Sequence, residues 1–190
     1  ENTNDGSLEG SPSWVTGITG MAIDFDGNDD RVDCGTSSSM DMGTGDFTIT
    51  AWIKMGSNQN AYPTIVSKGA GSNTDAGYWM TIRGSRLWLY LSNGTSRISL
   101  SSDIAAFEDN QWHHVAASID RSGDITFYRD TISIGTTDVS QFNGANITNN
   151  DPFSIGSWET NSSTYFDGLI DDSRLFAAAL NTAEIAAVFN

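Results

Sequence analysis

The sequence predicts an all-β fold in which two antiparallel sheets pack face to face and one short helical turn follows near the C-terminus. Three observations predict this class. Short segments alternate apolar and polar residues, turn residues separate these segments about every 8–12 residues, and only one segment has its apolar residues at helical spacing. Because sandwiches of this length commonly form one unit, we expect residues 1–190 to be a single domain.

The N-terminal part supplies the first strands after a polar stretch, residues 1–13, that reads as loop. Alternating segments follow at 21–26, 31–35, 47–54 and 64–68. The first of them places Met21, Ile23 and Phe25 on one face. Each segment is therefore predicted to be a strand that buries at least one face.

Hairpins dominate the middle of the chain. Residues 77–83 and 86–92 flank Gly84-Ser85, which is typical of a two-residue hairpin turn. Further strands are predicted at 97–101, 112–120, 124–130, 131–136, 152–156 and 169–176.

A single helix is predicted at 181–189. Either Asn181 or Thr182 can cap its first turn, and its apolar stripe consists of Ile185, Val188 and Phe189. We expect this helix to cover one edge of the sandwich.

The charge of the chain excludes some partners and favours others. The net charge is −15, which disfavours binding to nucleic acid or to an anionic membrane because both need a basic face. The sequence has 19 Asp but 5 Glu, and Asp is a residue of turns and of oxygen-rich metal sites. Calcium binding is one interpretation of this excess. A loop-rich β protein from a saline setting is the other.

Several segments stand in a characteristic order and spacing: 4–10, 21–27, 47–54, 111–115, 127–130, 153–156, 166–176 and 179–185. Together they resemble the laminin-G-like domains of the concanavalin A-like lectin and glucanase superfamily, which are jelly rolls related to pentraxins. The resemblance implies a two-sheet antiparallel jelly-roll sandwich. Two departures matter. The family usually begins with an earlier strand that is missing here, so one sheet edge is expected to be open or filled otherwise, and Thr131 replaces a turn glycine.

A calcium site is predicted where two distant strands meet. If 21–26 and 165–176 pair, they can bring Asp26 and Asp171 to one corner, with Asn28 supplying a carbonyl or amide oxygen. The resemblance also places calcium in this region. Asp24 and Asp172 are weaker candidates, and the alternative is that these side chains cap turns and face water.

A carbohydrate site is predicted on the hairpin 78–92. If its aliphatic residues and Tyr78 point inward, the other face carries aromatic and polar groups together: Trp79, Thr81, Arg83, Arg86, Trp88 and Tyr90. Sugars bind flat aromatic faces flanked by hydrogen-bonding side chains. The residues expected to extend this face are Thr48, Thr50, Trp52, Arg97 and Ser99, and Tyr62 and Trp158 form a second candidate site on loops. The alternatives are that a loop covers Trp79 and Trp88, or that the two faces are reversed.

Catalytic motifs are not found. The Glu-x-Asp-x-x-Glu strand of related glycosidases is missing, and the five Glu are scattered. No Gly-x-Ser-x-Gly elbow or phosphate loop occurs. His113 and His114 are adjacent on a predicted strand and point to opposite faces, which disfavours joint metal binding.

The leading hypothesis is therefore a non-catalytic, lectin-like module that binds a polysaccharide or other glycan through Trp79, Arg83, Arg86, Trp88 and Tyr90, and that calcium stabilises through Asp26, Asn28 and Asp171. We expect it to be extracellular, excised from a larger polysaccharide-degrading or adhesive protein whose other domains are its partners. A protein-interaction or spacer domain with structural calcium is the alternative. A glycoside hydrolase or polysaccharide lyase is the third possibility.

Overall fold

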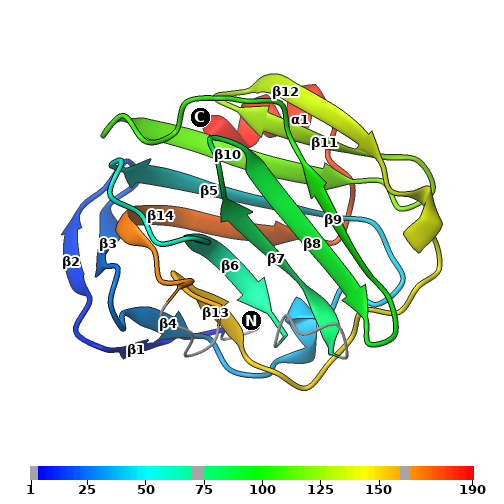
Figure 1. Ribbon diagram of the computed structural model, residues 1–190, viewed down its shortest axis with the longest axis horizontal. Helices are drawn as coiled ribbons and strands as arrows, with labels where there is room; N and C mark the ends of the chain where they lie inside the picture. The colour runs from blue at the N-terminus through cyan, green and yellow to red at the C-terminus, as the bar shows by residue number, and fades with distance from the viewer. Residues whose placement is uncertain (1–3, 70–74, 159–162) are drawn as a thin grey trace.

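The computed structural model describes residues 4–69, 75–158 and 163–190. The chain forms two antiparallel sheets of seven strands that lie face to face, as predicted (Figure 1). The first sheet has the order β1 (Ser7–Glu9), β4 (Arg31–Asp33), β13 (Phe153–Ile155), β6 (Thr64–Lys68), β7 (Ala76–Ile82), β8 (Leu87–Asn93) and β9 (Arg97–Ser101). The second has the order β12 (Ile132–Asp138), β11 (Asp124–Arg129), β10 (Trp112–Ile119), β5 (Phe47–Met55), β14 (Asp167–Phe176), β3 (Met21–Asp26) and β2 (Ser13–Thr16).

Three helical segments complete the described chain. They are the 3-10 turns η1 (Ser38–Met40) and η2 (Ser140–Phe142) and the helix α1 (Thr182–Phe189). Among the described residues, no helix has the length and apolar character needed to cross a membrane.

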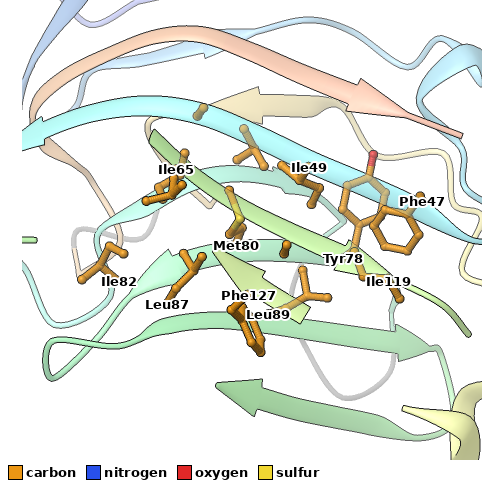
Figure 2. Close-up of a cluster of buried hydrophobic side chains, with 14 of the residues drawn as sticks. Phe47, Ile49, Ile65, Tyr78, Met80, Ile82, Leu87, Leu89, Ile119 and Phe127 are labelled. Atoms are coloured by element: carbon orange, nitrogen blue, oxygen red, sulfur yellow. The ribbon is translucent and has the colours of Figure 1, made fainter. Parts of the chain in front are cut away.

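The core lies between the sheets, on the faces that alternation predicts, except at the start of β3, where Met21 is 51% exposed. In the β7–β8 pair, Tyr78 lies opposite Leu91, and the next core pairs are Met80 with Leu89 and Ile82 with Leu87. All six side chains are buried in one cluster with residues of the second sheet such as Phe47, Ile49, Ile119 and Phe127 (Figure 2). Burying an aliphatic or aromatic side chain of this size stabilises the fold by roughly 1.5–3 kcal/mol. One face of the hairpin packs into this core. The other face therefore carries Trp79, Trp88 and Tyr90.

The turn between β7 and β8 is the two-residue turn that the sequence predicts. Gly84 and Ser85 have φ values of 55° and 53°. Arg83 and Arg86 exchange backbone hydrogen bonds of 2.9 and 3.2 Å across it. Two successive residues with positive φ form the tight turn whose twist matches that of the strands. This turn fixes the register that brings the outward side chains of β7 and β8 level with one another.

The N-terminal stretch differs from the prediction of a loop over residues 1–13. Ser7–Glu9 form β1 at the edge of the first sheet, where Leu8 pairs with Val32. Ser13–Thr16 form β2 at the edge of the second sheet, where Trp14 pairs with Ile23. Both strands are short and mostly exposed, so they lack the apolar alternation that reveals a strand in a sequence.

The helix α1 forms where it is predicted, but it covers the outer face of the second sheet, over β5, β10 and β11, and not an edge of the sandwich. Asn181 accepts hydrogen bonds from the backbone of Ala183 and Glu184, and the Glu184 side chain accepts one from the Asn181 backbone, which completes a capping box. The ring of Trp52 lies 4.9 Å from that of Phe189. Trp52 therefore belongs to the contact between helix and sheet.

The predicted extension of the aromatic face by Thr48, Thr50 and Trp52 is thus wrong. These residues lie on β5 in the second sheet, whereas β7 and β8 lie in the first. Thr48 Oγ1 donates to the Ala178 carbonyl beneath the C-terminal segment. Alternation indicates which residues share a face of a strand, but it does not indicate which strands share a sheet.

Candidate functional site

The outward face of β7 and β8 carries a continuous series of stacked aromatic rings. Trp79 lies directly opposite Tyr90 across the strand pair, with ring centroids 4.6 Å apart and planes within 4° of parallel. Trp158 also stacks on Trp79, at 4.9 Å, and Trp88 stacks on Tyr90 at 6.0 Å. Stacked and offset arrangements of this kind stabilise aromatic pairs beyond their buried area.

Two arginines lie against these rings. The guanidinium of Arg83 is 4.8 Å from the ring centre of Tyr62 and 5.9 Å from that of Trp88. The guanidinium of Arg97 is 5.7 Å from the ring of Trp79 and 5.8 Å from that of Tyr90. Cations at such distances are attracted to the faces of aromatic rings.

These residues enclose a pocket of about 410 Å³. It is lined by Tyr62, Trp79, Arg83, Trp88, Tyr90, Arg97, Ser99, Trp158 and Ser163. The two candidate sites of the sequence, the β7–β8 face and the loop aromatics Tyr62 and Trp158, are therefore parts of one pocket.

The aromatic residues of the pocket differ in exposure. Trp79 is 2% exposed and Tyr90 is 7% exposed, so their faces are largely covered by the neighbouring rings. Trp88, Tyr62 and Trp158 are half-buried. Burial raises the pKa of the Tyr90 hydroxyl, and the nearby Arg83 opposes this shift. Trp79 and Tyr90 thus form the inner wall of the pocket, and Trp88 presents the more accessible ring.

Arg86, predicted to be part of this site, is not among the residues that line the pocket. Its Nη1 donates to the carbonyl of Ser102 at 2.6 Å, so its side chain is directed to the segment after β9. Arg97 and Ser99 of β9 line the pocket instead. The register of β8 with β9 sets Ser99 opposite Tyr90 and Arg97 opposite Ser92, so both lie next to the aromatic residues of β8. The sequence predicts both residues as an extension of the aromatic face, and both line the pocket.

The predicted calcium ligands do not all meet. The strands β3 and β14 are neighbours, as expected, but the register sets Asp26 opposite Asp167, and Ile170 opposite Ile23. Asp171 therefore lies four residues further along β14, a distance of roughly 13 Å along the strand. The expectation that Asp26 and Asp171 share one corner is wrong.

Asp171 has a different structural task. It is 6% exposed, and its Oδ2 accepts hydrogen bonds from the backbone of Ile18 at 2.7 Å and Thr19 at 2.9 Å. A carboxylate that accepts two backbone N–H groups satisfies donors of the turn between β2 and β3. Asp171 therefore fastens this turn to the central strand β14.

A different carboxylate group forms around Asp26. Carboxylate oxygens of Asp26, Asp29 and Asp30 all lie within 4.8 Å of one another. Asp30 is buried and accepts hydrogen bonds from the backbone of Ser11 at 2.6 Å and of Asp26 at 3.1 Å. Asp29 and Asp30 were not predicted as ligands. Their position in the sequence, three and four residues after Asp26, could have indicated that they lie in the same turn.

We call the cluster of Asp26, Asp29 and Asp30 the acidic turn. Asn28 lies within the same segment. Its backbone N–H and its side-chain amide both donate to the Asp26 carboxylate, at 2.9 and 3.0 Å, and these bonds lower the pKa of Asp26. Burial, followed by the charges of Asp30 and Asp26, raises the pKa of Asp24, while burial and the charges of Asp26 and Asp24 raise that of Asp167. The acidic turn therefore has an excess of negative charge, and its carboxylate oxygens are the hard ligand atoms that calcium prefers.

Comparison with known proteins gives one family and several structural relatives. The family model described as "Concanavalin A-like lectin/glucanases superfamily" matches residues 26–186. Among curated proteins, adhesion G-protein coupled receptor V1 of Danio rerio is 29% identical over 150 residues, which cover 76% of this chain and 2% of that receptor. The chain therefore corresponds to a small part of the receptor.

Two solved structures show the same fold. The binding domain of Paraclostridial Mosquitocidal Protein 1 superposes with a TM-score of 0.77 at 19% identity, covering 99% of this chain and 48% of that one. Domain 4 of AbnA, an extracellular GH43 arabinanase from Geobacillus stearothermophilus solved with arabinotriose, superposes with a TM-score of 0.70 at 16% identity, covering 97% of this chain and 88% of that one. At these identities the likeness concerns the fold alone.

Proposed function

We propose that this chain, which belongs to the concanavalin A-like lectin/glucanases superfamily, is a carbohydrate-binding module without catalytic activity. The observation that carries the proposal is the aromatic pocket on β7 and β8, whose volume of about 410 Å³ suits a few sugar units. The arabinotriose complex of a similarly folded domain supports the same ligand class.

Each part of the pocket has a task in this proposal. The half-buried ring of Trp88 offers an apolar surface for the C–H face of a sugar. Arg83 and Ser99 are exposed at the pocket and supply hydrogen-bond donors for sugar hydroxyls. Trp79 and Tyr90 hold the pocket in shape through their mutual stacking, which reduces the entropy that is lost on binding.

The experiment compares glycan binding by the wild-type chain with binding by Trp88→Ala, on a glycan array and then by calorimetry. Trp14→Ala is the matched control, because Trp14 is an exposed tryptophan on β2, outside the pocket. Loss of an aromatic contact of this kind should weaken binding by roughly tenfold or more. Glycan binding that Trp88→Ala and Trp14→Ala leave equally unchanged would place the site elsewhere.

A protein-interaction or spacer domain is the second candidate function. The observation that favours it is the near-complete burial of Trp79 and Tyr90, whose faces contact other rings. The similarity to a segment of an adhesion receptor is compatible with it. The absence of binding to every glycan on the array, by a folded protein, would favour this candidate.

Calcium is proposed as a stabilising ion at the acidic turn. Asp26, Asp29 and Asp30 would supply carboxylate oxygens, and the backbone carbonyls around Asn28 lie in the same turn. Calcium would neutralise the repulsion among these groups and add no catalytic step. Asp171 is not part of this proposal, because the register of β3 with β14 sets Asp167, and not Asp171, opposite Asp26.

We also propose an extracellular location as part of a larger protein. The structural relative AbnA is described as extracellular, and the matched receptor is much longer than this chain. Fractionation of the source cells with an antibody against residues 75–158 would test the location and the size of the parent protein together.

A further inference from the structure

We infer that the glycan bound in the aromatic pocket carries one isolated anionic group, a carboxylate or a sulfate ester, and that Arg83 recognises this group. The inference rests on the proposed function and names the ligand class of the same pocket. Three features carry it: the way the guanidinium is held, the charges that line the pocket, and the net charge of the chain.

Arg83 is held so that it can present its donors. Its guanidinium lies near the rings of Tyr62 and Trp88, and the indole Nε1 of Trp88 donates to the Arg83 carbonyl at 3.0 Å. The residue is exposed, so its side chain is accessible from solvent. One part of the guanidinium is directed at the Tyr90 hydroxyl, which it hydrogen-bonds. A guanidinium has five N–H donors, so others remain for a ligand, and this planar fork matches the two oxygens of a carboxylate or sulfate.

The charged residues that the structure describes in the pocket lining are basic. Arg83 and Arg97 are two of the nine basic residues of the chain, and no Asp or Glu is among the described residues that line the pocket. Arg83 takes part in none of the ion pairs of the described chain, which join carboxylates to Arg31, Lys68, His113, Arg129 and Arg174. An anionic ligand would therefore meet the positive charge of Arg83 with no carboxylate among the described lining residues to compete for it.

The net charge of the molecule limits how many anionic groups the ligand can carry. A chain with a charge of −15 repels a long polyanion, and this repulsion acts over about one Debye length, roughly 8 Å at physiological salt. The pairing with Arg83 acts at contact range, where solvent and salt screen it less. The pocket thus suits a mostly neutral glycan with a single acidic residue better than a densely charged polymer such as heparin.

The test is a glycan array in which every acidic oligosaccharide is printed beside its carboxyl-reduced or desulfated form, together with heparin. Wild type is compared with Arg83→Gln, Arg86→Gln and Trp88→Ala. Arg86 is the matched control because it lies on the same hairpin and carries the same charge, but its guanidinium donates to Ser102. Melting curves establish that each variant is folded.

The expected result is stronger binding to sparsely charged acidic glycans than to their neutral forms, by roughly tenfold or more. Arg83→Gln should remove this preference, and Arg86→Gln should keep it. Equal binding to both members of each pair, with loss in Trp88→Ala, would overturn the inference and leave the proposed function intact. Strongest binding to heparin would also overturn it. No binding to any glycan by folded wild-type protein would overturn the proposed function itself.

Discussion

At the scale of single residues, His114 shows how burial makes one side chain sensitive to pH. Its ring lies under α1, 5.4 Å from the ring of Trp52 and 5.7 Å from that of Phe189. Its Nδ1 is buried without a hydrogen-bond partner in the described part of the chain. Burial lowers the pKa of His114 from 6.5 to about 4, against the opposing influence of Asp130 and Asp172.

This shift predicts a loss of stability in mild acid. The unfolded chain binds a proton near pH 6.5 and the folded chain does so only near pH 4, so the free energy of unfolding falls between these values as the pH falls. The contribution of His114 is fully present above pH 6.5, and about 2 kcal/mol of it should be lost between pH 7.5 and pH 5. Urea unfolding at the two pH values measures the change.

His114→Phe is the control for this prediction, since it keeps an aromatic ring under the helix and removes the titration. The variant should lose much less stability than the wild type between the same pH values. An equal loss in both proteins would show that groups other than His114 cause the pH dependence.

Also at this scale, the sequence predicts which face of a strand a residue lies on better than it predicts where a long side chain is directed. Alternation alone identifies Tyr78, Met80 and Ile82 as core residues and Trp79 as an outward residue, and the structure agrees. It does not separate Arg83 from Arg86. The two residues flank the same turn, and only the position of the Ser102 carbonyl draws Arg86 away from the pocket.

At the scale of elements, the β11–β12 hairpin contains a local strain that can be tested. Arg129 pairs with Ile132, which leaves Asp130 and Thr131 as a two-residue turn. Their φ values are 51° and 70°, so Thr131 adopts the left-handed conformation that favours glycine. A β-branched residue is strained in this conformation.

We predict that Thr131→Gly stabilises the protein. Removing the strain should raise the free energy of unfolding by about 1 kcal/mol, which corresponds to an increase of about 2–4 °C in Tm for a chain of this size. Calorimetry measures the change. Thr136→Gly is the control, because Thr136 lies within β12 and glycine should weaken a strand there. A lower Tm for Thr131→Gly would contradict the prediction.

The sequence did not predict the registers between paired strands. The pairing of β3 with β14 was predicted, but the residues that face each other across it were not. β14 also has an irregularity between Asp171 and Arg174, where Asp172 has a φ of 46°. A bulge shifts every later residue relative to its neighbours, and no pattern in the sequence marks it.

At the scale of the whole molecule, the calcium proposal depends on both the negative charge of the chain and the fold that brings β3 beside β14. The acidic turn lies at the end of β3, where Asp167 of β14 faces Asp26. Its three carboxylates come from one short segment, so calcium would not join the two ends of the chain through its first ligands. The expected stabilisation therefore comes from neutralising charge and from binding the folded state alone.

We predict that saturating calcium raises Tm and that Asp29→Asn removes this increase. At a calcium concentration about 100 times Kd the gain is about 2.7 kcal/mol, or roughly 5–10 °C in Tm. Scanning calorimetry with calcium and with EDTA measures it. Asp29 is the chosen ligand because it is exposed, whereas Asp30 also anchors Ser11. In EDTA, Asp29→Asn should melt at or slightly above the wild-type temperature, because it relieves repulsion.

Asp171→Asn separates the acidic turn from the corner that the sequence predicted. Asp171 accepts two backbone hydrogen bonds from the turn between β2 and β3, so its replacement should lower Tm with or without calcium and leave the calcium increment unchanged. A calcium increment that disappears in Asp171→Asn and persists in Asp29→Asn would move the ion to β14. That result would require a register between β3 and β14 different from the one in which Asp26 faces Asp167.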